Sequence, residues 1–167
     1  MGLPLDVDLL LEIERIKRLK YAYLRCLDQK LWAELRSLFV DDATASYGGG
    51  RYEYEDADAI VDFIRDAMGD PGVHSSHRVT QPEIELSSPT EATGTWALED
   101  TVIDTRFDVT VRGAAFYEDR YVKVDDRWLI AHTGYKRTFE EVFPRTSIKG
   151  LVLTASWWST RGRSELG

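Results

Sequence analysis

Two polar residues suited to proton transfer lie close together on one predicted helix. Tyr23 belongs to an apolar stripe with helical spacing, and Asp28, five residues later, lies on the flank of that stripe. Side chains so spaced can point toward the same cavity. Two simpler interpretations remain open: Asp28 caps a following helix, and Tyr23 is a core tyrosine with a satisfied hydroxyl.

A second carboxylate stands on an apolar face. In the period-two segment 96–102, Asp100 shares its face with Trp96, Leu98 and Val102. A buried carboxylate is costly unless it is paired or protonated, so Asp100 needs a partner or a chemical role. The alternative is a β-bulge that changes the parity and returns Asp100 to solvent.

Histidine is the natural proton acceptor near neutral pH, because its ordinary pKa is about 6.5. His77 and His132 are both candidates for a general base, and Arg137 adds a cation late in the chain. No His–His or Glu-x-x-His spacing indicates a metal site, and Cys26 is expected to be a buried thiol. Glycine-rich phosphate loops and the Gly-x-Ser-x-Gly hydrolase motif are also missing from the sequence. We therefore expect no metal and no cofactor.

The elements that must position these groups follow from periodicity. Apolar residues recur every three or four positions over 8–28, 31–39 and 57–68, the last bounded by Asp56 and Gly69, which predicts three helices. Beyond Pro71 the pattern changes to a period of two. It predicts strands at 77–87, 91–104, 107–124 and 127–138, joined by short ones near 44–47 and 51–54. This order is typical of an α+β domain whose helices cover one face of a curved sheet.

Length and charge restrict the class of protein. We expect one domain over 1–167, with a core at about 8–143 and a tail, 144–167, that packs on or closes a pocket. The net charge of −8 opposes nucleic acid and membrane partners. No apolar run approaches about 18 residues and no leader pattern is present, so a cytoplasmic location is expected.

Several segments together resemble a known family. They are Tyr23–Asp28, His77 ahead of Pro82-Glu83-Ile84, Trp96–Asp100, Gly113–Tyr121, and Thr133–Arg137 with Glu140-Glu141. In order and spacing they resemble the bile-acid 7α-dehydratases. Those enzymes belong to the SnoaL-like branch of the nuclear-transport-factor-2-like superfamily, with scytalone dehydratase, lindane dehydrochlorinase and ketosteroid isomerase. The resemblance covers about residues 8–143.

The resemblance implies a fold and a set of site residues. The fold is a cone-shaped α+β barrel, in which three N-terminal helices pack on a strongly curved antiparallel or mixed sheet and enclose one deep pocket, often in a homotrimer or dimer. The implied catalytic residues are Tyr23, Asp28, His77, Asp100 and Arg137. His77 would be the base, oriented by either aspartate. We expect substrate contacts from Trp96, Leu98, Phe116 and Tyr47.

The implied activity is elimination of water without a cofactor. The expected substrate is a hydrophobic, polycyclic hydroxy-carbonyl compound such as a steroid or bile-acid derivative, free or as a coenzyme A thioester. The loop 103–112 and the tail depart from the family pattern, so the substrate stays open. Two alternatives also remain: a double-bond isomerase or polyketide cyclase, and a non-catalytic small-molecule-binding module.

Overall fold

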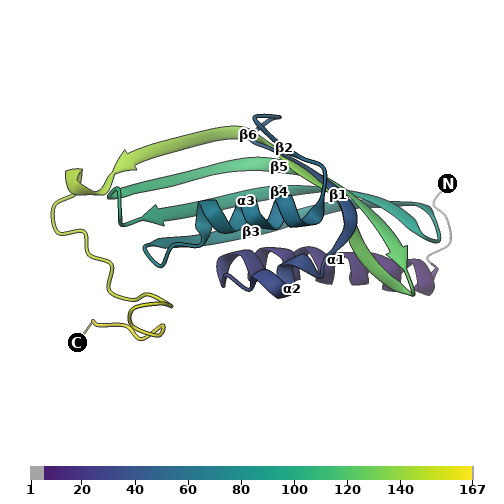
Figure 1. Ribbon diagram of the computed structural model, residues 1–167, viewed down its shortest axis with the longest axis horizontal. Coiled ribbons are helices and arrows are strands. Elements are labelled where there is room, and N and C mark those ends of the chain that lie inside the picture. Colours follow the sequence, from purple (N-terminus) through teal and green to yellow (C-terminus); the bar gives the residue numbers. More distant parts are fainter. Residues whose placement is uncertain (1–5, 167) are drawn as a thin grey trace.

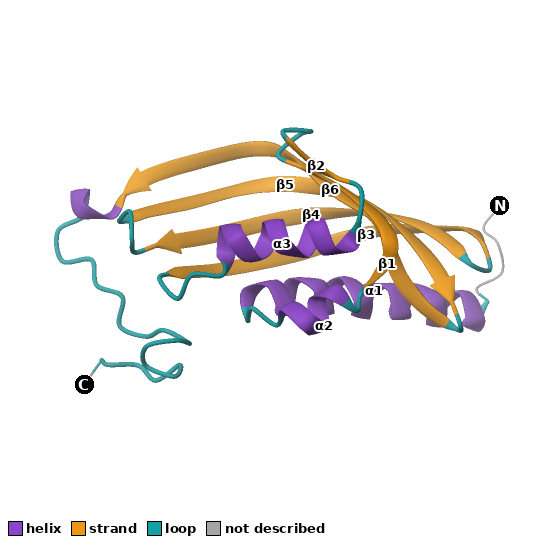
Figure 2. Cartoon of the chain, viewed as in Figure 1, coloured by secondary structure: helices purple, strands orange, loops and turns teal. Residues whose placement is uncertain are grey.

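Three helices lie on one face of a single sheet in the computed structural model, which describes residues 6–166 (Figures 1 and 2). The helices are α1 (Val7–Asp28), α2 (Trp32–Arg36) and α3 (Ala57–Met68), and a 3-10 turn, η1 (Arg145–Ser147), follows the last strand. None of the described helices is both long and apolar enough to span a bilayer.

The sheet has six strands in the order β2-β1-β6-β5-β4-β3. Their bounds are β1 (Phe39–Tyr47), β2 (Tyr52–Tyr54), β3 (Val73–Ser88), β4 (Glu91–Asp104), β5 (Val109–Val124) and β6 (Arg127–Pro144). All neighbours are antiparallel except β1 and β6, which run parallel. The predicted α+β class with a mixed, helix-covered sheet is confirmed. The sheet stays open, with β2 and β3 as its edges, so the barrel does not close.

Register shifts bend the long strands. The pairing between β3 and β4 shifts after Thr80, and that between β5 and β6 shifts where β6 carries the extra residues Ala131 and Thr138. An extra residue kinks its strand and increases the local twist. At the turn that joins β5 to β6, Asp125 and Asp126 both have positive φ, as a tight two-residue turn requires.

Capping residues set the helix boundaries. Asp56 caps α3 by accepting the Ala59 N–H at 2.7 Å, as predicted. Gly69 ends that helix with a right-handed φ of −74°, so it is not a left-handed cap. The second predicted helix is shorter than expected, because Phe39 already belongs to β1.

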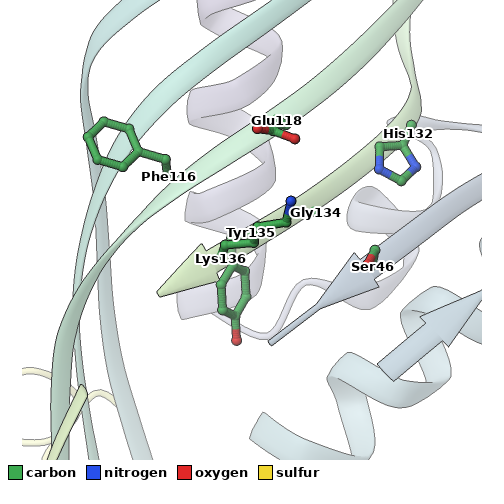
Figure 3. Close-up of a pocket in the computed structure, with 7 residues that line it drawn as sticks. All are labelled: Ser46, Phe116, Glu118, His132, Gly134, Tyr135 and Lys136. Carbon is green, nitrogen blue, oxygen red and sulfur yellow. The ribbon is translucent and has the colours of Figure 1, made fainter. Parts of the chain in front are cut away.

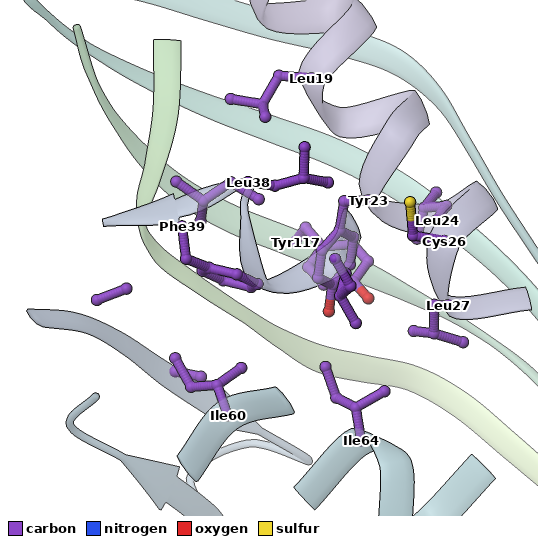
Figure 4. Packing of buried hydrophobic residues seen from close by; sticks show 14 of the residues in the cluster. Leu19, Tyr23, Leu24, Cys26, Leu27, Leu38, Phe39, Ile60, Ile64 and Tyr117 are labelled. Atoms are coloured by element: carbon purple, nitrogen blue, oxygen red, sulfur yellow. The ribbon is translucent and has the colours of Figure 1, made fainter. Parts of the chain in front are cut away.

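The core lies between the helices and the inner face of the sheet, which is the face that they cover (Figure 4). α1 contributes Leu19, Tyr23 and Leu27, and α3 contributes Ile60 and Ile64. Cys26 is fully buried among them as a free thiol, as predicted. In Figure 4 the hydroxyl ends of Tyr23 and Tyr117 point toward the helix that carries Ile60 and Ile64. The core therefore contains phenolic oxygens at its centre.

Candidate active site

Asp28 is the last residue of α1 and holds one segment of β3. Its carboxylate accepts hydrogen bonds from the Ser75 hydroxyl (2.8 Å), the His77 backbone N–H (2.9 Å) and His77 Nδ1 (2.7 Å). The capping alternative for Asp28 is wrong, because α2 begins after Leu31 without a side-chain cap. A carboxylate with three donors is fixed in position, and it fixes the histidine in turn.

The contact between Asp28 and His77 decides the state of the imidazole. A carboxylate at Nδ1 favours the tautomer with the proton on Nδ1, which leaves the Nε2 lone pair free to accept a proton. Within the described chain, Nε2 makes no protein hydrogen bond, and the ring lines a cavity. The His77 side chain is 7% exposed, so the imidazole is largely shielded from solvent.

Opposing effects act on the pKa of Asp28. Burial raises it, but hydrogen bonds from His77 and Ser75 and the electrostatic attraction of the His77 ring together outweigh burial, so the pKa lies below its ordinary value. The group is therefore a carboxylate at neutral pH. It can stabilise the imidazolium that forms when His77 takes up a proton.

The cavity has a volume of about 90 Å³ and an apolar wall with phenolic groups. Its described lining residues are Tyr23, Leu27, Tyr47, Phe63, Ile64, Ala67, Met68, His77, Tyr117 and Tyr135. The hydroxyls of Tyr23 and Tyr47 lie 3.0 Å apart and share a hydrogen bond. Burial raises the pKa of both, so they are neutral groups that can donate to an anion.

Asp100 lies next to this site but has its own partner. It is the cross-strand neighbour of His77, and its carboxylate accepts two hydrogen bonds from the Arg137 guanidinium, with Arg137 Nη2 2.9 Å from Oδ2. The bulge alternative is wrong, because the pairing of β4 with β5 is continuous and the Asp100 side chain is 3% exposed. Of the two aspartates, Asp28 contacts His77.

Gly113 makes room for this ion pair. A Cβ placed on Gly113 would lie 3.2 Å from Arg137 Nη1 and 2.5 Å from the Phe139 carbonyl oxygen. The Arg137 side chain on β6 therefore reaches Asp100 on β4 by passing over β5 at Gly113, the only residue of β5 without a side chain. Neither residue of the pair is among the described residues that line the cavity.

Three predicted substrate contacts lie elsewhere, and Tyr47 alone lines the cavity in the part of the chain that the structure describes. Trp96 and Leu98 are buried core residues, and the Trp96 indole donates to the Tyr121 hydroxyl at 2.9 Å. Phe116 is 51% exposed and faces away from the helices, because its neighbour Tyr117 takes the inward position. None of these three residues lines the cavity that contains His77.

His132 lies on the outer face, which is the face of the sheet without helices. It lines a second hollow of about 170 Å³ with Ser46, Phe116, Glu118, Gly134, Tyr135 and Lys136 (Figure 3). Its Nδ1 is 2.7 Å from the Thr44 hydroxyl. Of the two histidine candidates, only His77 lines the cavity.

The tail reaches the end of α1. The Lys30 ammonium lies 4.5 Å from the centre of the Trp158 ring and donates to the Val73 carbonyl at 2.8 Å. Every described residue that lines the cavity comes from Tyr23–Tyr135, ahead of the tail. The tail thus packs beside the entry of β3 without lining the cavity.

Sequence reasoning missed a buried ion pair behind the cavity. Lys20 Nζ lies 2.7 Å from Asp119 Oδ2, and both side chains are fully buried. The sequence pattern could have indicated this pair. Tyr117, Asp119 and Tyr121 alternate with polar residues on β5, which places Asp119 on the buried face, and Lys20 lies one helical turn before Tyr23. Tyr117 and Tyr135, which line the cavity, were missed as well.

Comparison with known proteins places this arrangement in a family. The sequence profile of the SnoaL-like domain matches residues 8–134, which is most of the chain. The chain belongs to the SnoaL-like domain family. Asp28, His77 and the cavity residues Tyr23 and Tyr117 all lie inside the matched SnoaL-like region.

Solved structures share the SnoaL-like fold. A candidate scytalone dehydratase from Novosphingobium aromaticivorans has a TM-score of 0.74 at 26% identity, over 79% of this chain and 87% of that one. A hexachlorocyclohexane dehydrochlorinase from Novosphingobium barchaimii has a TM-score of 0.75 at 18% identity, over 89% and 97%. A cystatin-like protein from Nostoc punctiforme has a TM-score of 0.60 at 19% identity, over 76% and 91%. Family and fold support a small-molecule-binding or lyase-type protein.

Proposed function

We propose that this protein is a cofactor-independent carbon–oxygen lyase that removes water from a hydrophobic hydroxy-carbonyl compound. One observation carries the proposal: Asp28 holds His77 through Nδ1, and the His77 ring lines an apolar cavity together with Tyr23 and Tyr47, whose hydroxyls share a hydrogen bond. A base and a donor for an oxyanion are the two groups that such an elimination needs. The likeness to the candidate scytalone dehydratase agrees with this reaction class.

The proposed reaction uses these groups in sequence. His77 Nε2 takes the proton from the carbon next to the carbonyl, and the electron pair moves onto the carbonyl oxygen as an enolate. The Tyr23 and Tyr47 hydroxyls stabilise that oxygen, and Asp28 stabilises the imidazolium. The enolate then re-forms the carbonyl with a new carbon–carbon double bond as the carbon–oxygen bond breaks. The imidazolium returns its proton to the departing hydroxyl, which leaves as water.

Cavity size limits which part of a substrate is enclosed. An apolar cavity of about 150 Å³ holds one benzene molecule, and this one has about 90 Å³. The cavity therefore takes the reacting atoms and part of one ring. We propose a substrate with its hydroxy-carbonyl group on a terminal ring. A full steroid or bile-acid skeleton requires that its remaining rings lie outside, or that α3, which carries Phe63, Ile64 and Met68, moves away from the sheet.

The test is a substrate panel read by mass spectrometry. The panel holds β-hydroxy ketones with one ring, two fused rings and a complete steroid skeleton, and loss of one water is the expected result for at least one of them. His77→Gln should abolish the loss. His132→Gln is the matched control on the outer face and should retain it. Product of unchanged mass would indicate an isomerase, and binding without product would indicate a binding module; either result overturns the lyase.

A further inference from the structure

The buried ion pair behind the cavity has a defined set of contacts. Lys20 Nζ lies 2.7 Å from Asp119 Oδ2, and neither side chain reaches solvent. The Tyr121 hydroxyl donates to the same carboxylate oxygen at 2.6 Å, and Thr133 donates to the other at 2.7 Å. Asp119 therefore has donors on both oxygens. The Lys20 ammonium contacts one carboxylate, that of Asp119, and on its cavity side it lies against tyrosine rings.

Stability alone is a poor reason for this pair. Taking both charges out of water costs several kcal/mol for each ion, and well-packed hydrophobic residues of similar volume often stabilise a protein as well or better. Burial lowers the pKa of Lys20, and the attraction of Asp119 acts against that effect. A charge held in the core at such a cost acts strongly on the groups around it, because the surroundings screen it little.

The nearest neighbours are two tyrosines that line the cavity. Lys20 Nζ lies 3.3 Å from the centre of the Tyr117 ring and 4.8 Å from the centre of the Tyr23 ring. Lys20 precedes Tyr23 by one helical turn, and Asp119 follows Tyr117 by two residues on the same strand face. The pair thus lies one layer behind the phenolic wall of the cavity.

A cation against an aromatic face withdraws electron density from the ring, and a phenol so polarised donates a stronger hydrogen bond. We propose that the Lys20 ammonium, held in place by Asp119, is a positioning group that polarises Tyr117 and Tyr23, so that their hydroxyls stabilise an anion in the cavity more strongly. The Asp119 carboxylate by itself acts in the opposite direction, because its charge raises the pKa of both phenols, so the cation is the group that strengthens the donors. The role of that anion as an enolate rests on the proposed function. The electrostatic effect on the two tyrosines does not depend on it.

Nuclear magnetic resonance of the wild-type protein tests the starting condition. The Nζ resonance of Lys20 should have the chemical shift of a charged ammonium at pH 7, displaced by the ring current of Tyr117. A neutral amine at that position overturns the proposal. This measurement requires no variant.

A charge-free variant tests the effect on the tyrosines. In Lys20→Met/Asp119→Leu, the Cζ resonance of Tyr117 should move most, that of Tyr23 less, and that of the exposed Tyr52 not at all. This order follows the two distances. Thr133→Val is the matched control, because it removes a donor to Asp119 and leaves the ammonium in place; it should lower stability without moving Tyr117. Unmoved Tyr117 and Tyr23 resonances in the double variant overturn the proposal, as does an equal Tyr117 shift in Thr133→Val.

Turnover provides the functional measurement once a substrate is known. The double variant should lose about tenfold in kcat with little change in KM, because the pair acts on an interaction made in the transition state. Wild-type kcat in the double variant would overturn the functional part. If the wild-type protein dehydrates no member of the panel, the proposed function fails while the resonance result still decides the electrostatic one.

Discussion

The two faces of the sheet carry two histidines with almost the same local geometry. His77 Nδ1 lies 2.7 Å from Asp28 on the inner face, and His132 Nδ1 lies 2.7 Å from Thr44 on the outer face. Both rings line a hollow. The difference is the partner: a carboxylate fixes one tautomer and stabilises an imidazolium, whereas a hydroxyl adapts to either tautomer and carries no charge. Distance alone therefore does not identify a base.

Replacing each histidine in turn with glutamine gives the largest expected difference in turnover. His77→Gln should reduce turnover by about 10³-fold or more, because a positioned general base supplies roughly 10²–10⁴-fold and its partner Asp28 loses its function with it. His132→Gln should stay within about twofold. Steady-state kinetics on the best panel substrate measures both, and equal losses would remove the distinction between the faces.

Replacing the hydrogen-bond partner of each histidine tests the same difference between the two faces. Asp28→Asn should reduce kcat by about 10²-fold, because a neutral amide does not stabilise the imidazolium and can hold the wrong tautomer. Thr44→Val, the matched change at His132, should leave kcat near that of the wild type. Circular dichroism must show that both variants are folded, and full activity in Asp28→Asn would refute the role of the carboxylate.

Removing one phenolic donor should have a smaller effect. Tyr23→Phe leaves Tyr47 within reach of the same oxygen, so we expect a loss of about tenfold in kcat, below the usual cost of a lost oxyanion donor. Tyr52→Phe, at an exposed tyrosine outside the cavity, is the control. A loss larger than that of Asp28→Asn would make Tyr23, and not the imidazole, the principal group.

The smallest expected difference is in how the free energy of unfolding depends on pH. Burial, with a contribution from Arg120, lowers the pKa of His132 below its ordinary value despite the opposing effects of Asp119 and Glu118. The unfolded chain then binds protons more readily than the folded one, so stability falls as pH drops from about 6.5 toward the folded-state pKa. Urea unfolding at pH 7 and pH 5 should show a smaller loss in His132→Gln than in the wild type. Identical losses would contradict this assignment.

Much of the fold is predictable from the sequence, because periodicity reports which side of each element is buried. The stripe through Tyr23 and Leu27 and the alternation in β4 gave the helices and the inward position of Asp100. The boundary at Phe39 was missed, since an apolar residue satisfies either a helix stripe or a strand. Closure of the sheet depends on twist and register, which periodicity does not report.

The candidate site was predictable in its residue types and less so in its contacts. Tyr23, Asp28 and His77 come together, yet which aspartate holds the histidine depends on where α1 ends relative to β3. Phe116 was expected on the inner face of the sheet but lies on the outer face. Glu118 and Arg120, which share its face of β5, are polar and indicated the outer position. Lys20 was missed because a lone lysine on an apolar stripe is ordinarily a solvated flank residue.

The parallel contact between β1 and β6 has a consequence for how the chain acquires its structure. The strands from β3 to β6 pair with immediate sequence neighbours through tight hairpins, whereas Ala45 on β1 must find Thr133 near the end of the domain. Closing so long a loop costs conformational entropy, and folding is slower when the contacting residues are far apart in the sequence. During synthesis, the apolar side of β1 emerges well before its partner strand. The meander is thus the expected nucleus, with β1 joining last.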